Sequence, residues 1–134
     1  MKTQQSGFTL IELIAVIVIL GILAATALPK FVDMSGAAEQ SAVDGVAASL
    51  TSGAAMNYAN AVAISSGVIS GTPKVTVAKC SDVAKTLQGG ALPSGYNVTG
   101  TDTAVAALGD EANCTLSGKG SPRKTATFTA IGAP

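Results

Sequence analysis

Residues 7–29 read GFTLIELIAVIVILGILAATALP, and this stretch decides the architecture of the chain. From Phe8 to Leu28 it carries a single charge, Glu12. As a helix that rises about 1.5 Å per residue, these residues span roughly 32 Å, close to the hydrocarbon thickness of a bilayer. The rest of the chain is richer in Gly, Ser, Thr and Ala. The sequence therefore predicts one apolar N-terminal span followed by one polar head.

The orientation and the fate of the span have two interpretations. Lys2 precedes the span, so the positive-inside tendency places the short N-terminus in the cytoplasm and the head outside. The alternative is an ordinary secretory signal peptide, cut after Ala27 in the A-x-A sequence of residues 25–27. The apolar stretch is longer than the usual hydrophobic region of such peptides, and Glu12 makes membrane insertion less favourable by about 2 to 3 kcal/mol. Both features disfavour the signal peptide.

Past Pro29 the apolar positions continue at steps of three and four residues, which is the helical period. They are Val43, Val46, Ala47, Leu50, Ala54, Tyr58 and Ala61. We therefore expect one long helix to about Ala61, with a kink or melted turn near Pro29, where a backbone hydrogen bond is lost. The alternative is two or three short helices separated at Gly21, Gly36, Gly45 and Gly53, because glycine weakens helices.

The remaining residues, 62–134, form the head, which the sequence predicts to be α+β. β-branched residues and alternation predict strands at residues 74–79, 96–99, 114–117 and 125–131. Ser81-Asp82 is expected to cap a short helix that runs through Leu87, and Gly89-Gly90 to stop it. The strands are expected to form a small antiparallel sheet packed on the long helix.

Cys80 and Cys114 are the only cysteines. Their simplest interpretation in an exported head is one disulfide, which would stabilise the head by about 3 to 4 kcal/mol in the chain-entropy model. Two free thiols or half of a metal site are the alternatives. Two cysteines without histidine are a poor metal-ligand set, so no metal is expected.

Composition disfavours an enzyme. The chain has no histidine, no net charge and 12% charged residues, so imidazole catalysis and a long-range field for nucleic acid are both absent. No cofactor loop and no nucleophile paired with a base are visible in the head. Lys119, Arg123 and Lys124 form a solvated turn or contact an anion or DNA, and Asp110-Glu111 lacks the spaced ligands of a calcium loop.

Lys2 in a short polar leader, then GFTLIELI at residues 7–14, then an apolar run to Pro29 resembles the class III signal of type IV prepilins and pseudopilins. Within that superfamily, AATALPKFVDMSGAAEQSAV at residues 24–43 is most similar to type IVa pilins, particularly the mannose-sensitive haemagglutinin type. The resemblance implies the pilin fold. The expected divisions are a leader at 1–7, an apolar half-helix at 8–29, an amphipathic half-helix at 30–61 and the head at 62–134.

The resemblance also implies roles for single residues. A prepilin peptidase would cut between Gly7 and Phe8 and N-methylate Phe8, and Glu12 would neutralise the new amino terminus of a neighbouring subunit during filament assembly. An α-ammonium with an ordinary pKa of about 7.7 to 8.0 is costly in an apolar setting unless it is paired, which supports this role for Glu12 independently.

The function that follows is a structural subunit, a major pilin of a type IV pilus that serves adhesion, surface motility or DNA uptake. Its expected partners are further copies of itself, the prepilin peptidase, the pilus assembly platform with its ATPase, the inner membrane before assembly, and a host or abiotic surface. The expected location is the bacterial inner membrane and then the extracellular pilus. The alternatives are a minor pilin or type II secretion pseudopilin, and a secreted binding protein cut after Ala27.

Overall fold

A single helix, α1 (Leu10–Ser65), carries most of the N-terminal half of the chain in the computed structural model, which describes residues 7–70 and 74–134. The expectations for Lys2 and for the leader up to Ser6 lie outside these residues. The chain divides into two units, Met1–Ala37 and Ala38–Pro134. The second unit contains the second half of α1 and the whole head.

The prediction of one long helix is confirmed, and the alternative of two or three short helices is wrong. α1 continues without interruption through Pro29, so no turn is melted there, while the kink expected at this residue stays a prediction. It ends four residues later than the sequence suggested, because a Schellman motif closes it. Gly67 adopts a φ of 73°, and the N–H of Val68 donates to the Ala63 carbonyl at 3.0 Å while the N–H of Gly67 donates to the Ile64 carbonyl at 3.0 Å.

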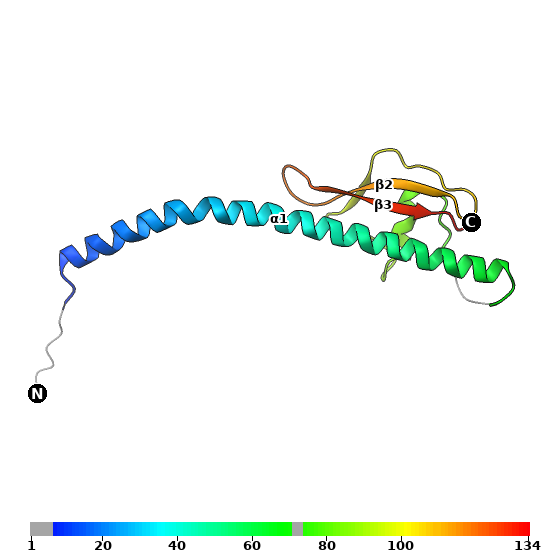
Figure 1. Cartoon of the computed structure of the whole chain (residues 1–134), viewed down its shortest axis with the longest axis horizontal. Helices are drawn as coiled ribbons and strands as arrows, with labels where there is room; N and C mark the ends of the chain where they lie inside the picture. The colour runs from blue at the N-terminus through cyan, green and yellow to red at the C-terminus, as the bar shows by residue number, and fades with distance from the viewer. Residues whose placement is uncertain (1–6, 71–73) are drawn as a thin grey trace, which may run out of the picture. The chain divides into compact units, whose positions relative to one another are not determined.

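Three strands form one antiparallel sheet in the order β1-β2-β3, namely β1 (Asn97–Thr99), β2 (Glu111–Ser117) and β3 (Thr125–Ile131). The predicted bounds of β3 are confirmed. β2 begins three residues earlier than expected, and Tyr96 lies just outside β1. Cys114 pairs with Phe128 at the centre of the β2–β3 ladder. Figure 1 shows β2 and β3 alongside the second half of α1.

The strand expected at residues 74–79 is wrong. Val77 and Lys79 make only isolated bridges, to Ala133 and Ala104. The side chain of Asn57 on α1 takes the place of a neighbouring strand: its Oδ1 accepts from the Val75 N–H at 2.9 Å, and its Nδ2 donates to the Val75 carbonyl at 2.8 Å. The chain then turns directly into the next element, so no ladder can grow.

The short helix of the head is a 3₁₀-helix, η1 (Cys80–Thr86), and the expected cap is wrong. Lys79 occupies the N-cap position without a side-chain hydrogen bond to the helix. The Asp82 carboxylate instead accepts from the N–H of Ala78 at 3.2 Å. Gly89 and Gly90 follow the helix with φ values of 98° and 71°, as the expected stop requires.

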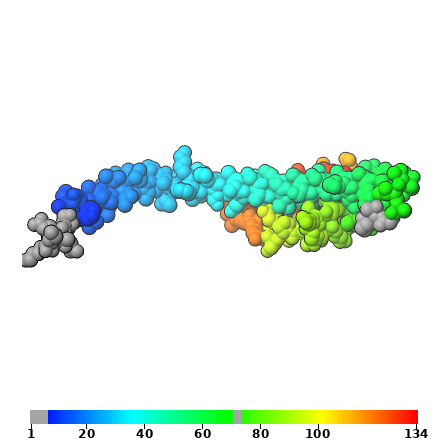
Figure 2. Space-filling view, turned by 90° about the horizontal axis from the view of Figure 1, so that it is seen from below, coloured from blue at the N-terminus to red at the C-terminus, as the bar shows by residue number. Residues whose placement is uncertain are grey.

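The core of the second unit lies between α1, the sheet and η1. The buried residues of α1 are Val43, Ala47, Leu50, Ala54 and Ala61, all members of the predicted stripe. They pack with buried residues of the other elements, among them Val83, Leu116 and Phe128. In Figure 2 the yellow-green and orange residues of the head cover one side of this part of α1. The predicted disulfide joins Cys80 of η1 to Cys114 of β2 across 34 positions of sequence.

Candidate assembly site at the start of the helix

Thr9 and Glu12 form a reciprocal capping box at the start of α1. The Glu12 carboxylate accepts from the Thr9 N–H at 2.8 Å and from the Thr9 hydroxyl at 2.7 Å, both through Oε2. The Thr9 Oγ1 accepts from the Glu12 N–H at 3.4 Å. Two backbone donors that the first helical turn leaves without partners are thereby satisfied. The single charge of the apolar stretch therefore fixes the point where the helix begins.

Thr9 is the residue that sequence reasoning missed. A Ser or Thr followed three positions later by an acidic residue, ahead of an apolar run, is the sequence signature of a capping box, and Thr9-Leu10-Ile11-Glu12 has that form. Glu12 was expected to pair with an amino terminus, and its pairing with Thr9 was not predicted. In the structure, the Glu12 carboxylate binds Thr9 of the same chain.

Gly7 and Phe8 lie directly before this cap, in backbone without regular secondary structure. The Phe8 side chain is 88% exposed. Together with Thr9 and Glu12 they line an open hollow of about 280 Å³. The peptide bond between Gly7 and Phe8 is thus outside the helix and accessible, and we call Gly7, Phe8, Thr9 and Glu12 the N-terminal site.

The helix that follows the N-terminal site exposes its apolar side chains. All residues from Gly7 to Ser35 are exposed, and an 18-residue window of α1 has a mean hydropathy of 2.7 with no share of it buried. By length and composition this part of α1 could cross a membrane. An apolar surface of this extent needs lipid or other protein chains to cover it.

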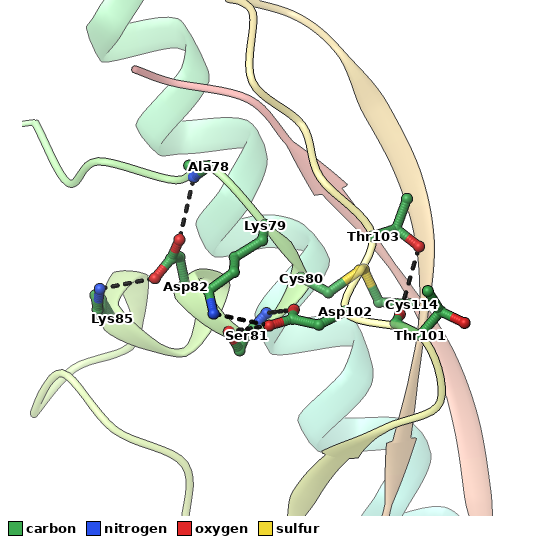
Figure 3. Close-up of polar contacts among 10 residues, drawn as sticks. All are labelled: Ala78, Lys79, Cys80, Ser81, Asp82, Lys85, Thr101, Asp102, Thr103 and Cys114. Carbon is green, nitrogen blue, oxygen red and sulfur yellow. Dashed lines mark hydrogen bonds and ion pairs between the residues drawn. A yellow bond between two sulfur atoms is a disulfide. The ribbon is translucent and has the colours of Figure 1, made fainter.

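A polar cluster in the head lies beside the disulfide (Figure 3). The Asp102 carboxylate accepts from the Ser81 N–H and from the Ser81 hydroxyl, both at 2.9 Å, and lies 3.0 Å from the Lys79 ammonium. The hydrogen bond from the Ser81 N–H, and to a smaller extent the hydrogen bond from Lys79, keep the pKa of Asp102 below its ordinary value of 3.8. The hydrogen bond to Asp102 in turn raises the pKa of Lys79 above 10.5.

Asp82 completes this cluster at the other side of η1 (Figure 3). Its carboxylate accepts from the Lys85 ammonium at 2.7 Å, and this bond is the main reason that the pKa of Asp82 lies below 3.8. The backbone adds two bonds between the same segments, from the N–H of Cys80 to the Thr103 carbonyl at 3.1 Å and from the N–H of Val105 to the Ala78 carbonyl at 2.8 Å. These contacts fasten the loop before β2 to η1.

The remaining predicted residues are not gathered into a site. Lys119 and Arg123 are exposed, and the cysteines are joined to each other. Across residues 7–70 and 74–134, no group of three or more His, Cys, Asp or Glu side chains could hold a metal ion. The part of the chain with distinctive chemistry is therefore the N-terminal site and the exposed apolar helix behind it.

Comparisons with known proteins point to the same segment. The family model described as the prokaryotic N-terminal methylation motif matches residues 2–28. The chain is 55% identical over 49 residues to the type IV narrow pilus major component PilA5 of Thermus thermophilus, covering 37% of this chain and 42% of that protein. It is 58% identical over 41 residues to the type IV major pilin protein PilE1 of Neisseria gonorrhoeae, covering 31% of this chain and 25% of that protein.

A third relative matches the head as well. Fimbrial protein Q of Moraxella bovis is 36% identical over 128 residues, which cover 85% of this chain and 75% of that protein. The matches to the first two relatives, by contrast, span less than half of their lengths. No solved structure matches the chain. The methylation motif, the long helix with its small antiparallel sheet and disulfide, and the extended match to a fimbrial protein together show that this chain belongs to the type IV pilin family.

Proposed function

We propose that this chain is the major structural subunit of a type IV pilus. Copies polymerise with the apolar half of α1 in the centre of the filament and the heads outside. The observation that carries this proposal is the uninterrupted exposure of α1 from Leu10 to Ser35, together with a mean hydropathy of 2.7 in an 18-residue window of this helix. A parallel bundle of copies covers that surface as completely as a bilayer does, and close approach is helped by its small residues.

Before assembly, a prepilin peptidase cuts the bond between Gly7 and Phe8 on the cytoplasmic side of the inner membrane and N-methylates Phe8. Support for this step comes from the accessible, non-helical backbone at these two residues. The family model described as a methylation motif, which matches residues 2–28, supports it as well. The assembly platform and its ATPase then move the subunit from the membrane into the extracellular filament.

Glu12 has two roles in the proposed assembly, as a helix cap and as the partner of an amino terminus. Its Oε2 holds the cap on Thr9, whereas Oε1 accepts no hydrogen bond from the residues that the structure describes. Cleavage creates an α-ammonium at Phe8 that enters the apolar centre of the bundle. A buried charge without a partner destabilises a complex strongly, so Oε1 of a neighbouring Glu12 receives this ammonium while the cap stays in place.

Three variants separate the charge of Glu12 from its capping role. Glu12→Ala removes both, Glu12→Gln keeps a hydrogen-bond acceptor without the charge, and Thr9→Ala removes the cap alone. We expect Glu12→Ala and Glu12→Gln to lower the yield of sheared filaments by about a hundredfold, because an unpaired buried charge costs about 3 kcal/mol or more. Thr9→Ala should keep most of the yield, and all three proteins should be processed and reach the membrane.

Normal filament yield from Glu12→Gln would refute the ion-pair role. A chain that is processed and exported but never appears in surface filaments, even with its native sequence, would refute the pilin function itself.

The names of the relatives favour the major pilin over the other roles. PilA5 and PilE1 are both named as major components or major pilins, rather than minor pilins or secretion pseudopilins. Cleavage after Ala27, as in a secreted binding protein, would cut α1 in the middle of continuous helix. Adhesion to a host or abiotic surface, surface motility and DNA uptake are the uses that we propose for the filament.

A further inference from the structure

The two ends of the β2–β3 ladder carry opposite charge. The loop between the strands, Gly118–Lys124, contains Lys119, Arg123 and Lys124, and we call it the basic loop. The opposite end of the ladder begins with Asp110 and Glu111, which we call the acidic end. Figure 1 shows the basic loop at the end of the ladder away from the C-terminus. The head thus has a positive and a negative end.

From this arrangement, and resting on the proposed filament, we propose that the basic loop of one head contacts the acidic end of the next head along the pilus. The partner is therefore a second copy of this chain. The two copies recognise each other through the opposite charges of the basic loop and the acidic end, which are different surfaces of the same chain.

Contacts with α1 fix where the basic loop lies. Gly118 lies against the side chain of Val43, and a Cβ on Gly120 would meet the Glu39 carboxylate at 2.7 Å. Lys119 and Arg123 are exposed, and among the residues that the structure describes none of the three cations of the loop has an ion pair. The carboxylates of Glu39 and of Asp44, which accepts from Gln40 at 2.8 Å, offset part of the three positive charges. The loop keeps an excess of positive charge toward solvent.

The acidic end is held near the end of α1. A Cβ on Gly109 would lie 3.4 Å from the ring of Tyr58. Asp110 accepts from the N–H of Ala107 at 2.8 Å, and Glu111 is exposed at the start of β2. Leu108 beside them is 42% exposed, which supplies a small apolar centre between the charges. The Lys74 ammonium, which donates to the Pro134 carbonyl oxygen, adds one positive charge near this end, so the two carboxylates leave an excess of negative charge there.

The distance between the two ends prevents them from pairing within one molecule. Glu39 and Tyr58 are separated by 19 positions of α1. At a rise of about 1.5 Å per residue this separation is roughly 28 Å along the helix, far beyond the reach of an ion pair. A contact between the basic loop and the acidic end therefore requires two chains.

A contact between two different surfaces also has the symmetry that a filament needs. Such a head-to-tail contact propagates without closing when copies keep one orientation, whereas a contact between identical patches stops at a dimer. Each exposed pair contributes little, but every subunit repeats it, and a head inserted the wrong way round would bring like charges together. The two charged ends therefore select parallel packing of the heads.

A charge swap in the full-length protein tests this contact. Arg123→Glu should lower the yield of sheared filaments about fivefold, the equilibrium change expected from one or two lost exposed pairs and a new repulsion. Glu111→Arg should do the same. The double variant Arg123→Glu with Glu111→Arg should recover the yield, because the pair re-forms with its signs exchanged. The matched control, Gln88→Glu with Ser94→Glu, makes the same change of net charge as Arg123→Glu at exposed positions of the head and should assemble normally.

Recovery in the double variant together with normal assembly of the control supports the contact. A near-UV circular dichroism spectrum that matches the native protein shows that each head has folded. Normal yield from Arg123→Glu, or no recovery in the double variant, would overturn the contact but leave the proposed function intact, since the presence of the native chain in surface filaments tests that function separately. Loss of duplex DNA binding by Arg123→Glu filaments at normal yield would also overturn it, and would assign the basic loop to nucleic acid.

Discussion

The Glu12 carboxylate can serve two environments, namely the first turn of its own helix and the apolar surface that other chains or lipid must cover. In the isolated chain the carboxylate binds the first turn of its own helix, which is worth about 1 kcal/mol for a typical cap. The same group stands at the start of an apolar surface that other chains or lipid must cover. A threonine that occupies only Oε2 leaves the carboxylate able to bind a second donor without giving up the first.

Replacing Thr9 should therefore loosen the start of α1 and nothing else. We expect Thr9→Ala to speed amide hydrogen exchange at residues 9–12 about fivefold, the effect of losing about 1 kcal/mol of capping. Thr9→Ser should retain the native rate. The measurement is hydrogen exchange on the full chain in detergent micelles, read by NMR, and equal rates in all three proteins would rule out the capping role.

Asp102 predicts how the head responds to acid. Its pKa is lowered on folding, so its contribution to stability is present above the ordinary value of 3.8 and is lost as the pH falls through the lower, folded value. Lys79, whose pKa is raised, contributes below 10.5 and loses its contribution as the pH rises through the higher, folded value. Between these limits both contributions are constant.

We therefore expect the thermal midpoint of the head to be level between about pH 5 and pH 9 and to fall below about pH 4. Asp102→Asn should lower the midpoint at pH 7 and flatten the acid decline, leaving the part that Asp82 supplies. The check is thermal unfolding followed by near-UV circular dichroism across this pH range. An acid decline as steep in Asp102→Asn as in the native protein would contradict the assignment.

At the scale of elements, the second half of α1 and β3 were predictable because each has a regular pattern, with steps of three and four residues in α1 and alternation in β3. The melted turn at Pro29 was wrong, since one lost hydrogen bond does not break a helix that continues on both sides. The strand at residues 74–79 was wrong because alternation cannot reveal that the neighbour of Val75 is an asparagine side chain. The Asp102 cluster could not be predicted, because its contacts join residues 21 positions apart.

Substitution of Asn57 tests its two hydrogen bonds to the backbone of Val75, which take the place of a neighbouring strand. Asn57→Ala leaves the N–H and the carbonyl of Val75 without their partner, so we expect a loss of about 1 to 2 kcal/mol of unfolding free energy. That loss corresponds to a fall of roughly 5 to 10 °C in the thermal midpoint of a unit of this size. Ser52→Ala, an exposed change on the same helix, is the control and should shift the midpoint little. Equal midpoints for Asn57→Ala and the native chain would show that water satisfies Val75 as well as Asn57 does.

At the scale of the whole molecule, the two units differ in how much of their function and structure the sequence predicts. The N-terminal unit was predictable in function because its motif, its apolar length and the lone carboxylate of its apolar span all point to one process, and the family model of the methylation motif matches residues 2–28. The head has a small core and a disulfide that spans 34 positions, so its details depend on contacts that no local pattern encodes. The positions of its two charged ends along α1 could be assigned only from the structure, in which Gly118 lies against Val43 and Gly109 lies against Tyr58.

The central claim is that the chain is processed at the N-terminal site and assembled into a surface filament. The most direct test is the intact mass and N-terminal sequence of the protein in material sheared from the cell surface. We predict a start at Phe8, one added methyl group, and two hydrogens fewer than the reduced chain. A start at Leu28, found in the culture fluid and not in filaments, would contradict this claim.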